Sequence, residues 1–332
     1  MIPNQWYIIL QSSEVKPGKP IGVTRMGEKL VAWRDTQGQV TVMSERCPHR
    51  GAALSAGKLK GDCLCCPFHG FEFDSAGRAR LIPANGRKTQ PPQAMQVKTY
   101  PTREMNDFIF IWWGAPRAEY PPLPWFEVID HQRCSWMTLR DHWKVHYSRA
   151  VENQLDVLHL PFVHHNTIGR GNLTLVNGPV TEIKELPGGS LLLNLWLDNE
   201  LDQGQTPLSP RQMSIPNRSP LLQFFFPNLW QIWLADDLHI VLAFAPVDDE
   251  NTFVYLRNYQ GFVTAPILRD VFNLFSAVGN SVIIRQDKRV VETQLPKRSA
   301  LKGGEVLVQG DGPIIEYRRR RQALLEAAQV QS

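Results

Sequence analysis

Two short segments in the first quarter of the chain each carry one cysteine and one histidine. One residue separates Cys47 from His49, and two residues separate Cys66 from His69. Thiolates suit iron–sulfur clusters and zinc, and imidazoles suit both metals. When two histidines replace two thiolates on one iron of a two-iron, two-sulfur cluster, negative charge is removed and the reduction potential rises. The four residues could therefore hold such a cluster.

The alternatives for these segments are a structural zinc site and a coincidence of ordinary core residues. Zinc-binding loops usually have two to four residues between their two ligands, and Cys47 and His49 have only one. Cys63 and Cys65 lie beside the second segment but outside the pattern, and with Cys134 they are interpreted as small core residues. Two segments with matched ligand types favour the iron–sulfur cluster.

A second group of metal-binding residue types follows in the middle of the chain. Asp156 and His159 are three residues apart, so a helix predicted over Trp143–Leu160 would place them on one face. Pro161 ends that helix and can fold His164 back towards His159. Two histidines and one carboxylate on one face of a ferrous ion leave positions open for dioxygen and substrate. A pair of core histidines with ordinary hydrogen bonds is the alternative.

Three further histidines lie close to this group. His142 and His146 are four residues apart, at helical spacing, and could also chelate a metal. No nearby carboxylate completes a triad with them, so they are interpreted as helix-surface or packing residues. His165 is adjacent to His164 and would point elsewhere.

The two groups resemble the motifs of the Rieske-type non-haem iron oxygenases. Cys-x-His followed by Cys-x-x-His is similar to the Rieske motif, and Asp-x-x-His followed by a second His is similar to the family's catalytic-iron motif. The stretch 287–292 looks most like the monooxygenase branch that includes aromatic O-demethylases. The resemblance implies that Cys47 and Cys66 hold one iron of a [2Fe–2S] cluster, and that His49 and His69 hold the other.

The resemblance also implies a mononuclear Fe(II) bound by His159, His164 and an acid far along the chain. Asp287 is the predicted third ligand, because it lies where the family carries its carboxylate. Asp270 and Glu292 are the alternatives. Asp270 would meet the helix dipole in the first turn of a predicted helix, and Glu292 could pair with a neighbouring base at the surface.

The chemistry that the resemblance implies needs both metal sites. The cluster stores one electron, and the mononuclear iron binds dioxygen, which then attacks a substrate carbon. The family also implies a head-to-tail homotrimer, in which the cluster of one subunit faces the mononuclear iron of the next. Asp156 would bridge them, accepting from His69 of the neighbouring subunit and from His159 of its own chain.

The expected activity is therefore that of the oxygenase component of a multicomponent system. It would hydroxylate or oxidatively demethylate a small organic substrate, aromatic or cyclic. A ring-dihydroxylating dioxygenase, a Rieske electron-transfer protein with a ligand-binding domain and a zinc-stabilised binding module are the alternatives. Several aromatic residues could line an apolar pocket, but most of them are interpreted as core: Phe224, Phe225, Phe226, Trp230, Trp233 and Phe244.

The elements that must position these groups divide at a proline-rich connector, Gly114–Pro124, which separates predicted domains 1–115 and 116–332. The first domain is predicted to be an all-β Rieske domain. The second is predicted to be a catalytic domain in which an antiparallel sheet is flanked by helices, an α+β, helix-grip-like arrangement. A helix beginning near Pro266 is predicted to have one apolar face, at Ile267, Val271, Leu274, Val278 and Val282.

Composition and the absence of certain motifs indicate where the protein works and which partners it needs. Among 332 residues, 36 Lys and Arg against 32 Asp and Glu give a net charge of only +4. No signal peptide and no apolar run of 18 residues is recognised, so a cytoplasmic protein with no membrane partner is expected. The absence of a Gly-x-Gly-x-x-Gly motif implies an external electron donor, an NAD(P)H-dependent reductase, a ferredoxin or both. The run Arg318–Arg321 is interpreted as a solvated tail helix rather than a nucleic-acid site.

Overall fold

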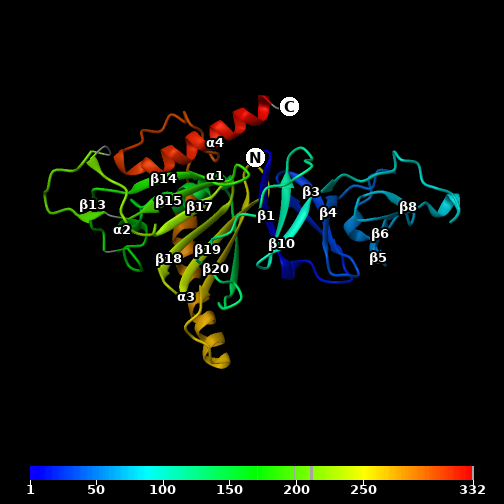
Figure 1. The fold of residues 1–332 in the computed structure, drawn as a ribbon, viewed down its shortest axis with the longest axis horizontal. Coiled ribbons are helices and arrows are strands. Elements are labelled where there is room, and N and C mark those ends of the chain that lie inside the picture. Colours follow the sequence, from blue (N-terminus) through cyan, green and yellow to red (C-terminus); the bar gives the residue numbers. More distant parts are fainter. Residues whose placement is uncertain (170, 198, 210–211, 331–332) are drawn as a thin grey trace. The chain divides into compact units, whose positions relative to one another are not determined.

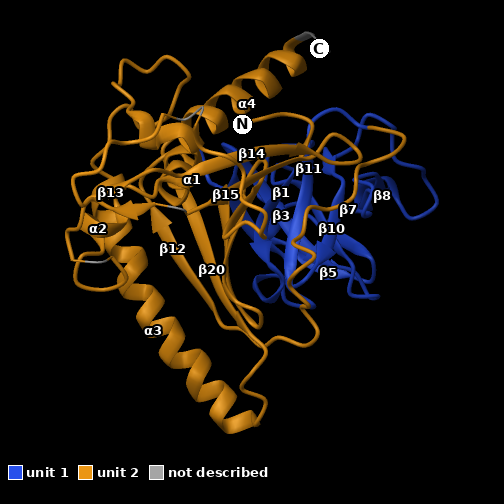
Figure 2. Ribbon diagram, turned by 60° about the vertical axis from the view of Figure 1, so that its left-hand side comes forward, with its two compact units in different colours: residues 1, 6–116, 246–248 blue, residues 2–5, 117–245, 249–332 orange. Residues whose placement is uncertain are grey.

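The structure is a computed structural model that describes residues 1–169, 171–197, 199–209 and 212–330. The chain divides into two compact units, drawn in blue and orange in Figure 2. Unit 1 comprises Met1, Trp6–Pro116 and Pro246–Asp248. Unit 2 comprises Ile2–Gln5, Arg117–Ala245 and Asp249–Ser332.

Unit 1 is built from short strands, as its β-branched and aromatic segments predict. The strands form one three-stranded sheet, β1-β11-β10, and two four-stranded sheets, β2-β3-β4-β9 and β5-β6-β7-β8 (Figure 1). Short 3-10 turns are its described helical elements. The strand bounds are β1 (Gln5–Gln11), β2 (Ile21–Arg25), β3 (Glu28–Arg34), β4 (Val40–Ser44), β5 (Lys58–Lys60), β6 (Cys63–Cys65), β7 (Glu72–Phe73), β8 (Ala79–Leu81), β9 (Thr99–Tyr100), β10 (Thr102–Met105) and β11 (Phe108–Trp113).

Two clusters of buried apolar side chains stabilise unit 1. One cluster packs side chains of β1, β3 and β11, among them Tyr7 and Ile109. The other contains Trp33 together with Cys47 and Cys66. Burial of one large apolar side chain contributes on the order of 1.5–3 kcal/mol to stability. The two cysteines of the paired segments are thus anchored in one core.

Unit 2 is built on a seven-stranded sheet in the order β12-β20-β19-β18-β17-β15-β14. From β14 to β19 the successive neighbours pair antiparallel, as in the predicted antiparallel sheet, and β12 pairs antiparallel with β20. The bounds are β12 (Thr138–Trp143), β14 (Val180–Glu185), β15 (Leu191–Trp196), β17 (Leu222–Phe225), β18 (Leu229–Ala235), β19 (Leu238–Pro246) and β20 (Thr252–Gln260), with a small pair of β13 (Leu175–Val176) and β16 (Glu200–Leu201).

The helix predicted over residues 143–160 is wrong at both ends. Trp143 is the last residue of strand β12, and helix α1 runs only over Tyr147–Leu155. Asp156 ends α1 because its backbone is extended, and its carboxylate accepts a hydrogen bond from Leu158 N at 2.7 Å. A second short helix, α2 (Leu160–Val163), carries Pro161 in its first turn, where a missing N–H costs nothing. Pro161 therefore begins a helix instead of ending one.

Helix α3 (Pro266–Val291) exists as predicted, but its predicted apolar face does not pack on the sheet. Ile267 is 81% exposed and Val278 is 57% exposed. The fully buried positions follow another stripe: Asn273, Ala277, Ile284, Asp287 and Val291. Hydrophobic periodicity identifies an apolar stripe without saying which stripe meets the core. By length and composition α3 could cross a membrane, but a single such helix among the described residues is weak evidence for a membrane span.

Helix α4 (Gly312–Val330) contains the run of arginines. It packs beside α1 and β14 (Figure 1). Arg318 and Arg321 are each only 4% exposed, so the run of arginines is not a solvated face. Arg318 Nε and Nη2 donate to the two carboxylate oxygens of Glu152 on α1, at 2.6 and 3.0 Å. Part of the basic run therefore forms buried ion pairs between α4 and α1.

Candidate metal centres

The segments that carry Cys47 and Cys66 adopt the same backbone turn. Gly51 N donates to Cys47 O at 2.8 Å, and Gly70 N donates to Cys66 O at 3.1 Å. Cys47 N donates to Ala52 O at 2.9 Å, and Cys66 N donates to Phe71 O at 2.8 Å. The two glycines have φ angles of 71° and 72°, which L side chains rarely adopt.

These matching turns bring two thiols and two imidazoles together. Cys47 and Cys66 are each 3% exposed, and neither forms a disulfide. His49 and His69 are exposed, and their ring centroids lie 4.6 Å apart. The pair of thiols is thus on the inner side and the pair of imidazoles on the outer side.

The donor set fits a Rieske cluster. Burial raises the pKa of the Cys47 thiol well above its usual range, and the adjacent Cys66 thiol raises it further. A thiolate at Cys47 is therefore unstable beside Cys66 in this core without positive charge nearby. An iron ion supplies that charge, and thiolates are the form of cysteine that binds metals. Cys63, Cys65 and Cys134 take no part in the paired turns; Cys65 is buried and the other two are half-buried.

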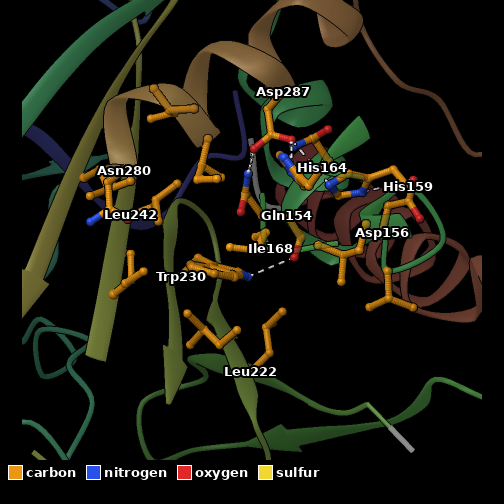
Figure 3. Close-up of a pocket in the computed structure, with 18 of the residues that line it drawn as sticks. Gln154, Asp156, His159, His164, Ile168, Leu222, Trp230, Leu242, Asn280 and Asp287 are labelled. Atoms are coloured by element: carbon orange, nitrogen blue, oxygen red, sulfur yellow. Dashed lines mark hydrogen bonds and ion pairs between the residues drawn. The ribbon is translucent and has the colours of Figure 1, made fainter. Parts of the chain in front are cut away.

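In unit 2, His159, His164 and Asp287 converge although α3 supplies the acid from far along the chain (Figure 3). One ligand atom from each lies within 4.8 Å of the other two. Nε2 of His164 lies 2.9 Å from Asp287 Oδ1, and Nε2 of His159 lies 3.3 Å from the same oxygen. The three groups are 13%, 2% and 5% exposed in the side chain.

This triad fits a metal ion better than it fits a set of ordinary hydrogen bonds. Asp287 Oδ1 is buried and, among the described residues, has no partner in hydrogen-bond geometry despite these short distances. Burial lowers the pKa of His159, but Asp156 and Asp287 raise it more, to about 9. Burial raises the pKa of Asp287, but the two histidines lower it more, to about 2. A carboxylate and two imidazoles aimed at one point are a common ligand set for non-haem Fe(II).

The other predicted candidates lie elsewhere. Asp270 is 69% exposed in its side chain and pairs with Arg269. Glu292 accepts a hydrogen bond from Lys144 N at 2.8 Å. Of the further histidines, His142 is exposed on strand β12 rather than on a helix, whereas His146 is fully buried. Neither belongs to the converging triad.

Asp156 lies beside the triad. Its Oδ2 is 3.6 Å from His159 Nδ1, which is an ion-pair distance but too long for a hydrogen bond. Its side chain is 28% exposed. The expected hydrogen bond between these two residues is therefore absent from the described contacts, while the approach is close enough to influence the pKa of His159.

A cavity of about 230 Å³ opens beside the triad (Figure 3). Strands β17, β18, β19 and β20 and helix α3 contribute most of its wall. Trp230 lines the cavity, and Phe224 and Phe226 instead pack on Tyr317 of α4, with ring centroids 5.6 Å away. Most lining side chains are aliphatic: Val157, Leu160, Ile168, Leu197, Leu222, Ile232, Leu234, Ile240, Leu242, Leu256, Ile283 and Ile284.

Two family models together cover most of the chain. The model of the Rieske [2Fe-2S] domain matches residues 5–101. The model of the vanillate O-demethylase oxygenase C-terminal domain matches residues 143–327, more than half of the chain. The chain belongs to the Rieske non-haem iron oxygenases. A chain with these two domains carries a Rieske [2Fe–2S] cluster and a mononuclear iron.

Curated relatives of this Rieske oxygenase share part of their length with it. The toluene-4-sulfonate monooxygenase iron-sulfur subunit TsaM1 of Comamonas testosteroni is 32% identical over 204 residues, 60% of this chain and 56% of that protein. Aminopyrrolnitrin oxygenase PrnD of Pseudomonas fluorescens is 33% identical over 176 residues, 51% of this chain and 48% of that protein. The chain spans about half the length of the curated relatives it matches.

Solved structures share the fold across the whole chain. Dicamba monooxygenase bound to dicamba aligns over 99% of both chains with a TM-score of 0.73 and 21% identity. The QL mutant of NdmA from Pseudomonas putida CBB5 with theobromine aligns over 98% of this chain and 91% of that chain, with a TM-score of 0.75 and 21% identity.

Two glutamines of this Rieske oxygenase contact the triad and were not predicted from the sequence. His164 Nδ1 lies 2.8 Å from Gln286 Oε1, and Thr167 Oγ1 donates to the same oxygen at 3.0 Å. Gln154 Nε2 donates to Asp287 Oδ2 at 3.3 Å. Gln286 immediately precedes Asp287, and this adjacency is the only signal in the sequence that points to it.

Proposed function

We propose that this chain is the oxygenase component of a multicomponent Rieske oxygenase. It would use dioxygen and externally supplied electrons to hydroxylate or oxidatively demethylate a small organic compound. The observation that carries the proposal is the convergence of His159, His164 and Asp287 at one side of an apolar cavity. A metal ion held there would have open positions facing a bound substrate.

In this proposal each metal centre has a defined set of protein ligands. Cys47 and Cys66 hold the inner iron of the cluster, and the exposed His49 and His69 hold the outer one. This order agrees with their burial. The triad of His159, His164 and Asp287 holds the mononuclear Fe(II). Domain 1–115 is then the Rieske domain and domain 116–332 the catalytic domain.

The residues around the triad have separate roles. The mononuclear iron, when bound, supplies the activation of dioxygen with electrons received through the cluster. Gln286 accepts a hydrogen bond from His164 Nδ1, so it keeps the proton there and leaves Nε2 free as a ligand. Gln154 holds one oxygen of Asp287 and so orients the other. The aliphatic wall excludes water from the reacting face.

The cavity favours an uncharged cyclic substrate. Its described lining residues include no lysine or arginine, and a buried carboxylate or sulfonate without a partner is costly. An engineered cavity of roughly 150 Å³ with a similar lining binds benzene, so about 230 Å³ suits a substituted monocyclic compound or a compact bicyclic one. Asn280 lies two helical turns before Asp287 and can orient a carbonyl or hydroxyl group.

The proposal includes partners and a setting. Electrons come from an NAD(P)H-dependent reductase, a ferredoxin or both, and the chain works in the cytoplasm. The active form is a head-to-tail homotrimer in which Asp156 bridges the mononuclear site to His69 of the neighbouring subunit. The exposure of the His69 ring and of the Asp156 carboxylate supports this, since both can be reached from outside their own chain. Ring dihydroxylation is the alternative reaction at the same site.

Iron analysis and a substrate panel test the proposed function together. Purified chain should contain three irons, against two for an electron carrier with a ligand-binding domain. With an external reductase, a panel of neutral methoxy-aromatic and N-methyl compounds should release formaldehyde if demethylation is the reaction. Formation of a cis-diol instead would assign the chain to ring dihydroxylation.

The triad is tested by replacing each candidate acid in turn. Asp287→Ala should abolish turnover and reduce the iron content from three to two per chain, while the visible spectrum of the cluster persists. Asp270→Ala and Glu292→Ala are the matched controls, because both residues lie away from the histidines. An active Asp287→Ala variant beside an inactive control would show that the third ligand has been wrongly assigned.

A further inference from the structure

A basic groove lies in unit 1, whose residues are all described. It is a cleft of about 480 Å³ formed by β8 and the loop that follows it. Four of its lining residues are cationic, Arg78, Arg80, Arg87 and Lys88, and its lining residues include no acid. We call this surface the basic groove.

The positive charge of the basic groove is largely uncompensated. Arg78 Nε and Arg80 Nη1 lie 3.3 and 3.8 Å from the same carboxylate oxygen of Asp74, and their side chains remain 65% and 59% exposed. Arg87 and Lys88 are exposed and form no ion pair with any residue that the structure describes. Exposed single-sign charge in a cleft attracts partners of the opposite sign.

The basic groove connects to the core that contains the cluster cysteines. Ala79 and Met95 line the groove, and both also pack against the buried cluster of side chains that includes Cys47 and Cys66. The loop after β8 touches the second cluster segment as well. A Cβ atom on Gly70 would lie 3.3 Å from Pro83 Cγ. Few side chains therefore separate this charged surface from the thiols.

We propose that the basic groove is the docking surface for an acidic electron-donor protein. The inference rests on the proposed function, which requires electrons from outside the chain. One electron would leave the reduced iron–sulfur group of the donor and enter the oxidised cluster, with no bond made or broken. Charge complementarity suits such a partner, because transient redox complexes have small interfaces and depend on electrostatic steering for fast association.

A pair of charge reversals tests the basic groove against net charge alone. Arg87→Glu with Lys88→Glu alters the groove, and Lys16→Glu with Lys19→Glu makes the same change in charge on an exposed loop beside the other core of unit 1. The probe is an acidic plant-type [2Fe–2S] ferredoxin. Stopped-flow absorbance measures the rate at which reduced ferredoxin reduces the cluster. This rate is divided by the rate at which a neutral photoreduced deazaflavin reduces the same cluster, which gives a normalised rate. Binding of oxidised ferredoxin to the immobilised chain is measured in parallel.

The groove variant should reduce the normalised rate at low ionic strength at least tenfold, with a matching loss of ferredoxin binding and a weaker dependence on salt. The loop variant should change either quantity less than threefold. Equal effects of the two variants, or no effect of the groove variant, would overturn the proposal. A single-stranded oligonucleotide that binds the groove as tightly as ferredoxin would overturn it too. A chain without a Rieske spectrum would refute the proposed function itself.

Discussion

At the scale of single residues, the mononuclear site depends on which ring nitrogen each histidine presents. Both His159 and His164 direct Nε2 at Asp287 Oδ1. For His164 this orientation has a visible cause, because its Nδ1 hydrogen bonds with Gln286 Oε1. Gln286 is itself held, since its Nε2 donates to Asn166 Oδ1 at 3.0 Å. The amide of Gln286 is therefore fixed in the orientation in which its oxygen accepts the hydrogen bond from His164.

Gln286→Leu should weaken Fe(II) binding about 10- to 100-fold, the usual cost of losing a group that orients a metal ligand. The replacement removes the amide oxygen that accepts from His164 Nδ1 and puts an apolar branched side chain in its place. Competition with a calibrated chelator measures the affinity. Gln322→Leu makes the same chemical change on α4, away from the triad, and should leave the affinity within twofold. Full affinity in Gln286→Leu would mean that the surrounding packing alone orients His164.

Local sequence patterns identified the candidate metal ligands, but they did not identify the side chains that contact those ligands in the folded protein. Cys47 lies near His49 in the sequence, and Asp156 lies near His159, so the sequence alone could identify both pairs as candidate ligands. Gln286 carries no such pattern, because any polar residue could precede Asp287 on a helix. Its contact with His164 depends on how α3 rotates against α2, which is a tertiary property.

At the scale of elements, α1 begins at a histidine that the sequence suggested was a surface or packing residue. His146 is fully buried and caps the helix, accepting from Ser148 N at 3.2 Å through Nδ1. Burial lowers the pKa of His146 to about 2. The folded protein therefore holds this imidazole neutral, and the unfolded chain protonates it below its ordinary pKa of 6.5.

The free energy of unfolding should consequently fall as pH drops below 6.5, because the unfolded state then binds the extra proton. Between pH 7.5 and 5.5 His146 should account for a loss of about 1.4 kcal/mol, one pKa unit of linkage. Urea unfolding of the wild type and of His146→Asn, which retains a capping acceptor, isolates this contribution. His142→Asn alters an exposed histidine and should keep the wild-type pH dependence. A parallel pH dependence in His146→Asn would mean that other groups cause the loss.

Helices α1 and α4 are joined by a network of ion pairs among two arginines and two glutamates. Arg318 binds Glu152 and Glu305, and Arg149 binds the same two acids, with the four contacts between 2.6 and 3.0 Å. The sequence showed a run of arginines but not their partners, since Glu152 lies 166 positions before Arg318. Pairing over such a separation cannot be read from local charge patterns.

Arg318→Met should reduce the free energy of unfolding by about 3–5 kcal/mol, because it leaves Glu152 buried with one partner fewer. Urea denaturation followed by circular dichroism gives the value. Arg319→Met is the control. Arg319 follows Arg318 on the same helix but is exposed, so the change should cost less than about 0.5 kcal/mol. A small effect of Arg318→Met would mean that Arg149 alone neutralises the two acids.

At the scale of the whole molecule, the two metal centres belong to different units, and the proposed trimer joins them through Asp156. Two local facts favour a role for this residue outside its own chain. Its carboxylate is partly exposed, and its distance of 3.6 Å from His159 Nδ1 leaves it without a strong internal hydrogen bond to that ring. The antiparallel sheet of unit 2 and the existence of α3 were predictable from sequence patterns, although the bounds of α1 and the buried face of α3 were not. An assembly of several chains leaves no local pattern in the sequence.

Asp156→Asn separates a bridging role from a local one. If Asp156 only orients His159, the variant should lose about 10- to 100-fold in iron affinity or activity. If it also accepts a hydrogen bond from His69 of the partner subunit, both metals should load, yet electrons should not cross between subunits. A single-turnover experiment distinguishes these cases: the cluster is reduced, substrate and dioxygen are added, and the cluster absorbance is followed. We expect reoxidation to slow by several orders of magnitude and product to be nearly absent.

Glu316→Gln, a charge-neutralising change on α4 at a residue paired with Arg320, is the control, and its cluster should reoxidise normally. Prompt reoxidation with full product yield in Asp156→Asn would eliminate the bridge and remove the main support for the trimer.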